Sequence, residues 1–189
     1  TRPEAGSAHP RYRLVAERPE SVARVASAIL LKANESRYTP AGWTVRVLDR
    51  GDDYFVNHVR MDVPVVSDRD VVIESHWVHD PVRDIFRMEW APPRGELPPV
   101  EAGVTRIESQ GYWEVTPLAS GGSRLVYEQH SEIGSSIPRW LIDRMMDDQI
   151  VDELVAVERI LENDLPAVAT PPPVRSSTAA TGPRLPSSA

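Results

Sequence analysis

A single long amphipathic helix, placed after six consecutive strand-like segments, constrains the fold of this chain more than any other feature. Between residues 137 and 161 the apolar side chains recur at intervals of three and four, as they do along one face of a helix. These apolar residues are Ile137, Leu141, Ile142, Met145, Met146, Ile150, Leu154, Val157 and Leu161. Ser135 or Ser136 can cap the helix, with Pro138 in its first turn. A helix of about 25 residues is about 37 Å long, so it can lie across a whole curved sheet.

The middle of the chain alternates apolar and polar residues with a period of two, which predicts β-strands. Short turns that contain glycine, or aspartate and proline, separate several of these segments as in an antiparallel meander. The predicted strands are residues 43–49, 54–61, 69–78, 85–90, 104–117 and 123–133. A short strand at 12–15 and a helical stretch at 20–31 precede them. This order predicts an α+β fold, with a curved antiparallel β-sheet wrapped around a long C-terminal α-helix.

The two ends of the chain differ in composition from the part between them. Residues 1–10 contain two prolines, one glycine and no apolar residue larger than alanine. In residues 166–189, Pro, Ala, Ser and Thr make up 18 of 24 positions, a composition that cannot bury enough apolar surface to order itself. We therefore predict a flexible lead over residues 1–10, one folded domain over 11–163 and a disordered tail over 164–189.

Composition excludes several classes of function. The chain has no cysteine, which excludes thiolate nucleophiles, iron–sulfur ligation and disulfides. Its net charge is −7 and its basic residues form no cluster, so nucleic acid is not expected as a partner. The longest wholly apolar runs, such as residues 28–31, are far shorter than the roughly 20 residues of a membrane-spanning helix. We expect a soluble protein that is cytoplasmic or, if a signal peptide preceded Thr1, periplasmic or secreted.

Five short segments resemble START domains, the StAR-related lipid-transfer family. They are PVVSDRDVV at residues 64–72, GVTR at 103–106, YWEVTPL at 112–118, LVY at 125–127 and GSSIPRWLI at 134–142. The resemblance covers about residues 12–161 and preserves the order and approximate spacing of the motifs. We expect the extra N-terminal helix and strand of full-length START domains to be absent or trimmed here, and Ser135 and Ser136 stand where the family often has a second glycine. What remains is the helix-grip core shared with the wider Bet v 1-like superfamily, which includes polyketide cyclases.

A helix-grip fold encloses a cavity between the concave face of its sheet and the long helix, so one parity of each strand faces that cavity. The positions of this parity combine aromatic, aliphatic and methionine side chains with uncharged polar ones. The candidate ligand-binding residues are Phe55, Asn57, Val59, Ile73, Ser75, Trp77, Met88, Trp90, Ser109, Trp113, Tyr127, Gln129, Ile142, Met145 and Gln149. Met145 and Met146 would close one side of the cavity. A core filled by these side chains is the alternative.

The resemblance implies a protein that binds a lipid or another hydrophobic small molecule for sequestration or transfer, with transient membrane contact and no cofactor. Asn57, Ser75, Ser109 and Gln129 would orient the polar end of the ligand. The proline-rich loop at residues 92–99 is a candidate gate. The alternative function is a polyketide cyclase or aromatase-like enzyme that uses Tyr127 or a buried amide. A third possibility is a regulatory module whose tail binds a partner.

No residue is assigned a catalytic or metal-binding role. His58, His76 and His130 fall on the outward parity of their strands, so they do not converge on the cavity. Asp68 and Asp70 share one face of a strand and Arg69 lies on the other. We therefore expect this triplet to form structural ion pairs at the start of the strand. The oligomeric state is left open.

Overall fold

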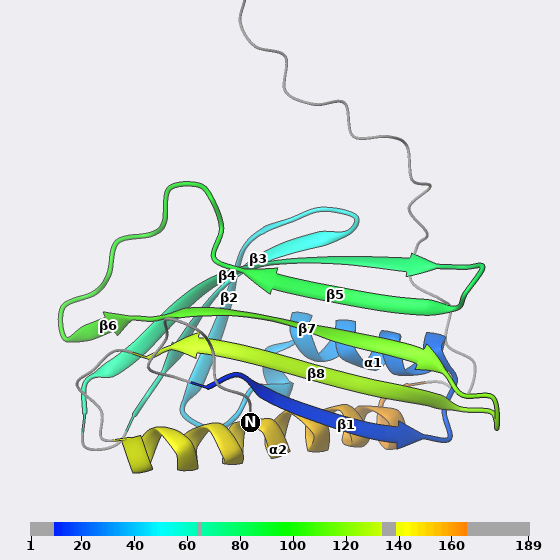
Figure 1. Cartoon of the computed structure of the whole chain (residues 1–189). Helices are drawn as coiled ribbons and strands as arrows, with labels where there is room; N and C mark the ends of the chain where they lie inside the picture. The colour runs from blue at the N-terminus through cyan, green and yellow to red at the C-terminus, as the bar shows by residue number, and fades with distance from the viewer. Residues whose placement is uncertain (1–9, 64–65, 134–138, 166–189) are drawn as a thin grey trace, which may run out of the picture.

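The computed structural model describes residues 10–63, 66–133 and 139–165, which form one sheet and two helices (Figure 1). The elements in chain order are β1 (Tyr12–Arg18), α1 (Val22–Asn34), the 3₁₀ turn η1 (Ser36–Tyr38), β2 (Trp43–Arg50), β3 (Tyr54–Met61), β4 (Asp68–Asp80), β5 (Ile85–Ala91), β6 (Val104–Arg106), β7 (Glu108–Pro117), β8 (Ser123–Glu132) and α2 (Arg139–Asn163). Neither helix has an apolar stretch long enough to cross a bilayer, as far as the described residues go. The caps predicted at Ser135 or Ser136, and residues 166–189 of the tail predicted over 164–189, lie outside the described residues. Leu165, at the start of that predicted tail, packs against the main core instead.

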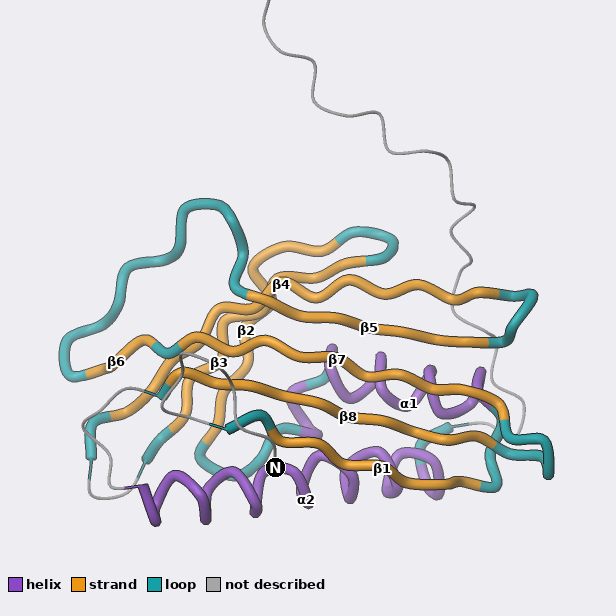
Figure 2. Tube along the Cα trace, viewed as in Figure 1, coloured by secondary structure: helices purple, strands orange, loops and turns teal. Residues whose placement is uncertain are grey.

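Seven strands form a continuous antiparallel path in the order β1, β8, β7, β5, β4, β3, β2. The sheet is strongly curved, and α2 runs along its length beside β1 and β8 while α1 lies behind β7 (Figure 2). This is the α+β helix-grip architecture that the sequence predicts. The alternation of buried and half-buried residues is cleanest along β3, where every second residue from Phe55 to Met61 is buried.

The segment predicted as one strand over 104–117 is two strands. β6 pairs in parallel with the start of β4, where Asp68 lies opposite Val104. The backbone N–H of Ile107 then donates to the carbonyl of Asp70 at 2.8 Å, and β7 continues between β5 and β8. Strand periodicity cannot reveal this change because alternation is the same whichever neighbour a strand pairs with.

The main core lies where both helices meet the sheet. The buried face of α1 contributes Val22, Val25, Ala26, Ala28 and Ile29. The C-terminal half of α2 contributes Val157, Ile160 and Leu161, which pack against sheet residues that include Phe86, Val115 and Leu125. Two polar contacts fix the helices: Arg18 Nη1 lies 2.5 Å from Glu158 Oε1, and Arg24 Nη2 donates to the Leu161 carbonyl at 2.6 Å. Each fully buried aliphatic side chain stabilises the fold by roughly 1.5 to 3 kcal/mol.

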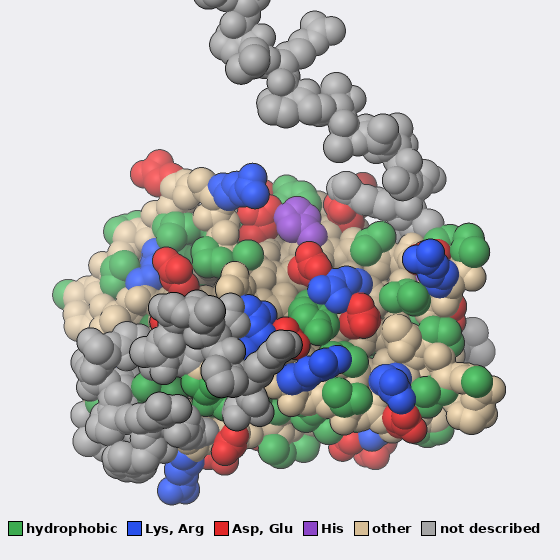
Figure 3. All heavy atoms as spheres, viewed as in Figure 1, with side chains coloured by type: hydrophobic (Ala, Val, Ile, Leu, Met, Phe, Trp, Pro, Cys, Tyr) green, Lys and Arg blue, Asp and Glu red, His purple; other side chains and the backbone are tan. Residues whose placement is uncertain are grey.

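The acidic and basic residues at the start of β4 make their ion pairs with neighbouring strands. Asp70 binds Arg106 of β6 and, at 2.8 Å, His58 of β3. Asp68 binds Arg60 of β3 at 2.8 Å. Arg69 points to the opposite face of β4 and is 1% exposed. On the face shown in Figure 3, basic and acidic side chains are intermixed over the surface of the sheet.

Candidate ligand-binding pocket

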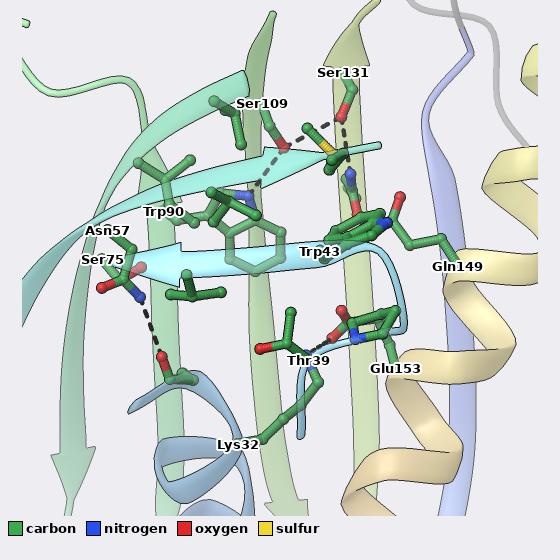
Figure 4. A pocket seen from close by; sticks show the side chains of 18 of the residues that line it. Lys32, Thr39, Trp43, Asn57, Ser75, Trp90, Ser109, Ser131, Gln149 and Glu153 are labelled. Carbon is green, nitrogen blue, oxygen red and sulfur yellow. Dashed lines mark hydrogen bonds and ion pairs between the residues drawn. The ribbon is translucent and has the colours of Figure 1, made fainter. Parts of the chain in front are cut away.

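A pocket of about 190 Å³ is lined by the concave face of the sheet, the end of α1, the segment that follows it and one face of α2 (Figure 4). Apolar side chains make up most of its wall. The candidate residues that line it are Phe55, Asn57, Val59, Ile73, Ser75, Met88, Trp90, Ser109, Trp113, Tyr127, Gln129 and Gln149. The strand elements bring these residues together because successive side chains of one parity share a face and the curved sheet turns that face inward.

Three candidates are not part of this lining. Trp77 lies against Phe55, with ring centroids 5.6 Å apart, further along β4 than the lining residues. Ile142 is buried in a separate cluster with Tyr12 and Ile133. The side chain of Met145 lies outside the described residues. Met146 lines the pocket from α2.

Stacked aromatic rings form one wall of the pocket. The rings of Trp90 and Tyr127 lie 5.6 Å apart with an interplanar angle of 25°, and Trp113 lies 4.4 Å from Tyr127. Gly111 of β7 allows this arrangement, because a Cβ there would lie 2.5 Å from the Trp90 ring and 2.1 Å from the Glu128 carbonyl oxygen. The missing side chain therefore lets the Trp90 indole lie across β7.

Polar groups within this wall form a hydrogen-bonded chain. Tyr127 Oη donates to Gln129 Oε1, and Gln129 Nε2 donates to Ser131 Oγ at 2.8 Å. Ser131 Oγ donates to Ser109 Oγ at 3.2 Å, which also accepts from Trp90 Nε1 at 3.3 Å. Burial raises the pKa of Tyr127 well above its ordinary value, with a further contribution from the negative charge of Glu153, so the phenol keeps its proton.

Asn57 and Ser75 place polar groups on the other side of the pocket. The Asn57 amide donates from Nδ2 to the Ala33 carbonyl at 3.1 Å, which anchors β3 to the end of α1. Its Oδ1 is buried and has no hydrogen-bond partner among the described residues. Ser75 is 2% exposed and lies near Asn57 in Figure 4. A buried carbonyl oxygen without a partner is costly, which marks this position as one that a ligand or water can satisfy.

The charged residues of the lining were not among the predicted candidates. Lys32 Nζ of α1 lies 2.5 Å from Glu153 Oε2 of α2, and this ion pair links the two helices at the pocket. Arg69 reaches the pocket from β4. Strand parity could have identified Arg69, because it shares a face with Val71 and Ile73. The loop at residues 92–99, predicted as a gate, contributes no described residue to the lining.

Comparisons with solved structures find the same fold in lipid-transfer proteins. A fragment of the STAR-related lipid transfer protein from Xanthomonas axonopodis is 23% identical with a TM-score of 0.71, covering 86% of this chain and 91% of that one. Human StAR-related lipid transfer protein 5 is 14% identical with a TM-score of 0.68, covering 85% of this chain and 79% of that one. No family model and no curated protein matches the chain.

An aromatase/cyclase has the same fold at greater structural distance. The Zhui aromatase/cyclase from Streptomyces sp. R1128 is 16% identical with a TM-score of 0.56, covering 84% of this chain and 97% of that one. At these identities the likeness is one of fold. The chain has the helix-grip fold that START domains share with aromatase/cyclases, which confirms the resemblance that the sequence motifs indicate.

Proposed function

We propose that this protein binds a lipid or another hydrophobic small molecule in its pocket, for sequestration or transfer. The observation that carries the proposal is a mostly apolar pocket with an aromatic wall and a few buried polar groups, which is the usual composition of a small-molecule site. Burial of apolar ligand surface would supply about 25 cal/mol per Å². The names of the similar lipid transfer proteins support the same class of ligand.

A filled core is the simplest competing interpretation of the same side chains. Two observations favour a ligand site over it. The pocket keeps a volume of about 190 Å³, whereas a packed core leaves few voids larger than a water molecule. Asn57 Oδ1 also has no partner within the described protein, whereas buried polar groups in a filled core are nearly always satisfied.

An aromatase or cyclase-like enzyme is the second candidate function, and one electrostatic interaction in the pocket favours it. Glu153 lies close enough to Tyr127 to raise its pKa, so the pocket holds a carboxylate near a protonated phenol. The Glu153 carboxylate is paired with Lys32, whose Nζ lies 2.5 Å from Glu153 Oε2. Turnover of a polyketide-like substrate that is lost in Glu153→Gln and Tyr127→Phe would favour the enzyme over the carrier.

Native mass spectrometry of the purified chain, followed by a panel of fluorescent lipids, tests the binding proposal. Ser75→Trp places a large ring in the pocket, so we expect loss of lipid binding with a nearly unchanged melting temperature. Val78→Trp is the matched control, because Val78 lies on the same strand and is 46% exposed. A wild-type protein that binds no member of the panel contradicts the proposal. Unfolding of Ser75→Trp alone would mean that Ser75 belongs to a packed core.

A further inference from the structure

The hydrogen bonds of Ser109 leave its own proton without an acceptor. A serine hydroxyl has two lone pairs and one proton to donate. Ser131 Oγ and Trp90 Nε1 donate to Ser109 Oγ, which occupies both lone pairs. No described residue accepts the remaining Ser109 proton, although this side chain lines the pocket and is only 8% exposed. Ser109 therefore offers a donor to the pocket.

Gln129 has the same surplus of donors. Its Oε1 accepts from Tyr127 Oη and, at 3.4 Å, from Gln149 Nε2, so the acceptor side of the amide is saturated. Its Nε2 carries two protons and gives one to Ser131 Oγ. No described residue accepts the second proton. Gln129 is 5% exposed and lines the pocket from β8, two residues before Ser131.

The charges of the lining favour the same kind of ligand. The charged side chains are Lys32, Arg69 and Glu153, so the described wall carries two cations and one anion. Lys32 and Glu153 bind each other, and Arg69 of β4 donates from Nη1 to Ser67, so the wall as a whole carries one net positive charge. The hydrogen bond from the Ile107 N–H to the Asp70 carbonyl joins the starts of β4 and β7, so Arg69 and Ser109 belong to the same end of the pocket.

Asn57 offers the pocket a hydrogen-bond acceptor rather than a donor, and it does so from a different strand. Its free group is an acceptor, Oδ1, on β3. The strands β4 and β5 lie between β3 and β7, so Asn57 cannot accept the proton of Ser109. The donor-rich wall around Ser109 and Gln129 is therefore a distinct subsite.

We propose that this subsite binds a carbonyl or carboxylate oxygen at the polar end of a single-chain ligand. The inference rests on the proposed function and specifies its ligand class: the ligand oxygen accepts from Ser109 Oγ and Gln129 Nε2 while its chain lies along the aromatic wall. A volume of about 190 Å³ is below the roughly 300–1,000 Å³ of sites for drug-sized ligands, so the pocket fits one chain rather than two.

Four probes of equal chain length test the proposal by titration calorimetry on the full chain: decanoate, methyl decanoate, 1-decanol and decylamine. We expect decanoate and methyl decanoate to bind about tenfold more tightly than decanol or decylamine, the difference that one or two hydrogen bonds make. Binding of decanoate alone assigns the subsite to a carboxylate, and binding of both acyl compounds assigns it to a carbonyl oxygen.

Two variants and one control show which residues cause the preference for decanoate and methyl decanoate. Ser109→Ala removes one donor, and Gln129→Glu replaces the amide donor by an acceptor of the same shape. Both are expected to abolish the preference for decanoate, with Gln129→Glu still binding decanol. Ser120→Ala is the matched control, because Ser120 lies exposed in the turn between β7 and β8. Circular dichroism melts verify that each variant is folded.

The outcomes separate this inference from the proposed function. Equal affinity for all four probes, or tighter binding of decanol or decylamine, overturns the acceptor preference while hydrophobic binding stands. A preference that survives in both folded variants also overturns it. Failure of the wild type to bind any of the four probes or any lipid of the earlier panel overturns the proposed function and this inference together.

Discussion

Asp70 is a buried carboxylate on the outer face of the sheet. Its side chain is 3% exposed and binds Arg106 and His58, from β6 and β3. Burial by itself would raise the pKa of Asp70, but the hydrogen bonds from Arg106 and His58 outweigh burial and lower that pKa below its ordinary value. Asp70 therefore ties three strands together through its ionised form.

The lowered pKa of Asp70 predicts a pH-dependent contribution to stability. A carboxylate with a lowered folded pKa contributes stability above the unfolded pKa of about 3.9, and this is lost as pH falls through the folded pKa. We expect Asp70→Asn to lower the free energy of unfolding by roughly 2 to 3 kcal/mol at pH 7, because it removes a charged partner of buried groups. The difference from wild type should shrink below about pH 4.

Urea unfolding at intervals between pH 7 and pH 3 measures this effect. Asp147→Asn is the control, because Asp147 is an exposed carboxylate on α2. A difference between Asp70→Asn and wild type that stays constant over the whole range would contradict the assignment.

At the scale of elements, α2 has three environments along its length and around its axis. Its C-terminal half packs Val157 and Ile160 into the main core. Its middle turns face the pocket with Met146, Gln149 and Glu153. Its outer face leaves apolar side chains in solvent, including Val155, which is 51% exposed. The helix is therefore held to the protein by its C-terminal half and by Ile142 near its start, while its middle closes the pocket.

Truncation of apolar side chains on α2 should distinguish these environments. Ile160→Ala leaves a cavity in the core, and we expect it to lower the free energy of unfolding by roughly 2 to 5 kcal/mol. Val155→Ala, on the same helix, is the matched control and should change it by less than about 0.5 kcal/mol. Denaturant unfolding with fluorescence detection compares the two. Equal losses would mean that α2 is not docked through this face.

At the scale of the whole molecule, the sheet order brings the two ends of the domain together. β1 pairs with β8, and the chain closes with α2 against α1. The hydrophobic clusters of the described residues use side chains from Tyr12 to Leu165. The described clusters thus draw on side chains within the range 11–163 predicted as the domain and on Leu165 beyond it.

The C-terminal segment should be dispensable for this fold. Because residues 166–189 are dominated by Pro, Ala, Ser and Thr, they offer little apolar surface for docking. We expect deletion of residues 166–189 to leave the melting temperature and lipid binding unchanged. Differential scanning calorimetry of the two chains measures this. A drop of several degrees would show that the segment docks on the domain.

The side of each strand that faces the pocket could be predicted from the sequence alone. Successive side chains of a strand point to opposite faces of the sheet. Once one apolar residue is assigned to the inner face, every second residue along that strand is assigned to the same face. Parity therefore places Asn57, Ser75, Ser109 and Gln129, which belong to four strands, on the same face without any knowledge of the strand order. The length of α2 followed in the same way from its helical spacing.

Only the tertiary structure decided how the elements meet. The ion pair of Lys32 with Glu153 joins two helices that are far apart in the chain, and no local pattern indicates which turns of two helices face each other. The parallel pairing of β6 and the position of Trp77 against Phe55 likewise depend on neighbours in space. Periodicity determines the direction of a side chain from its own element, whereas the partner it finds there depends on packing between elements.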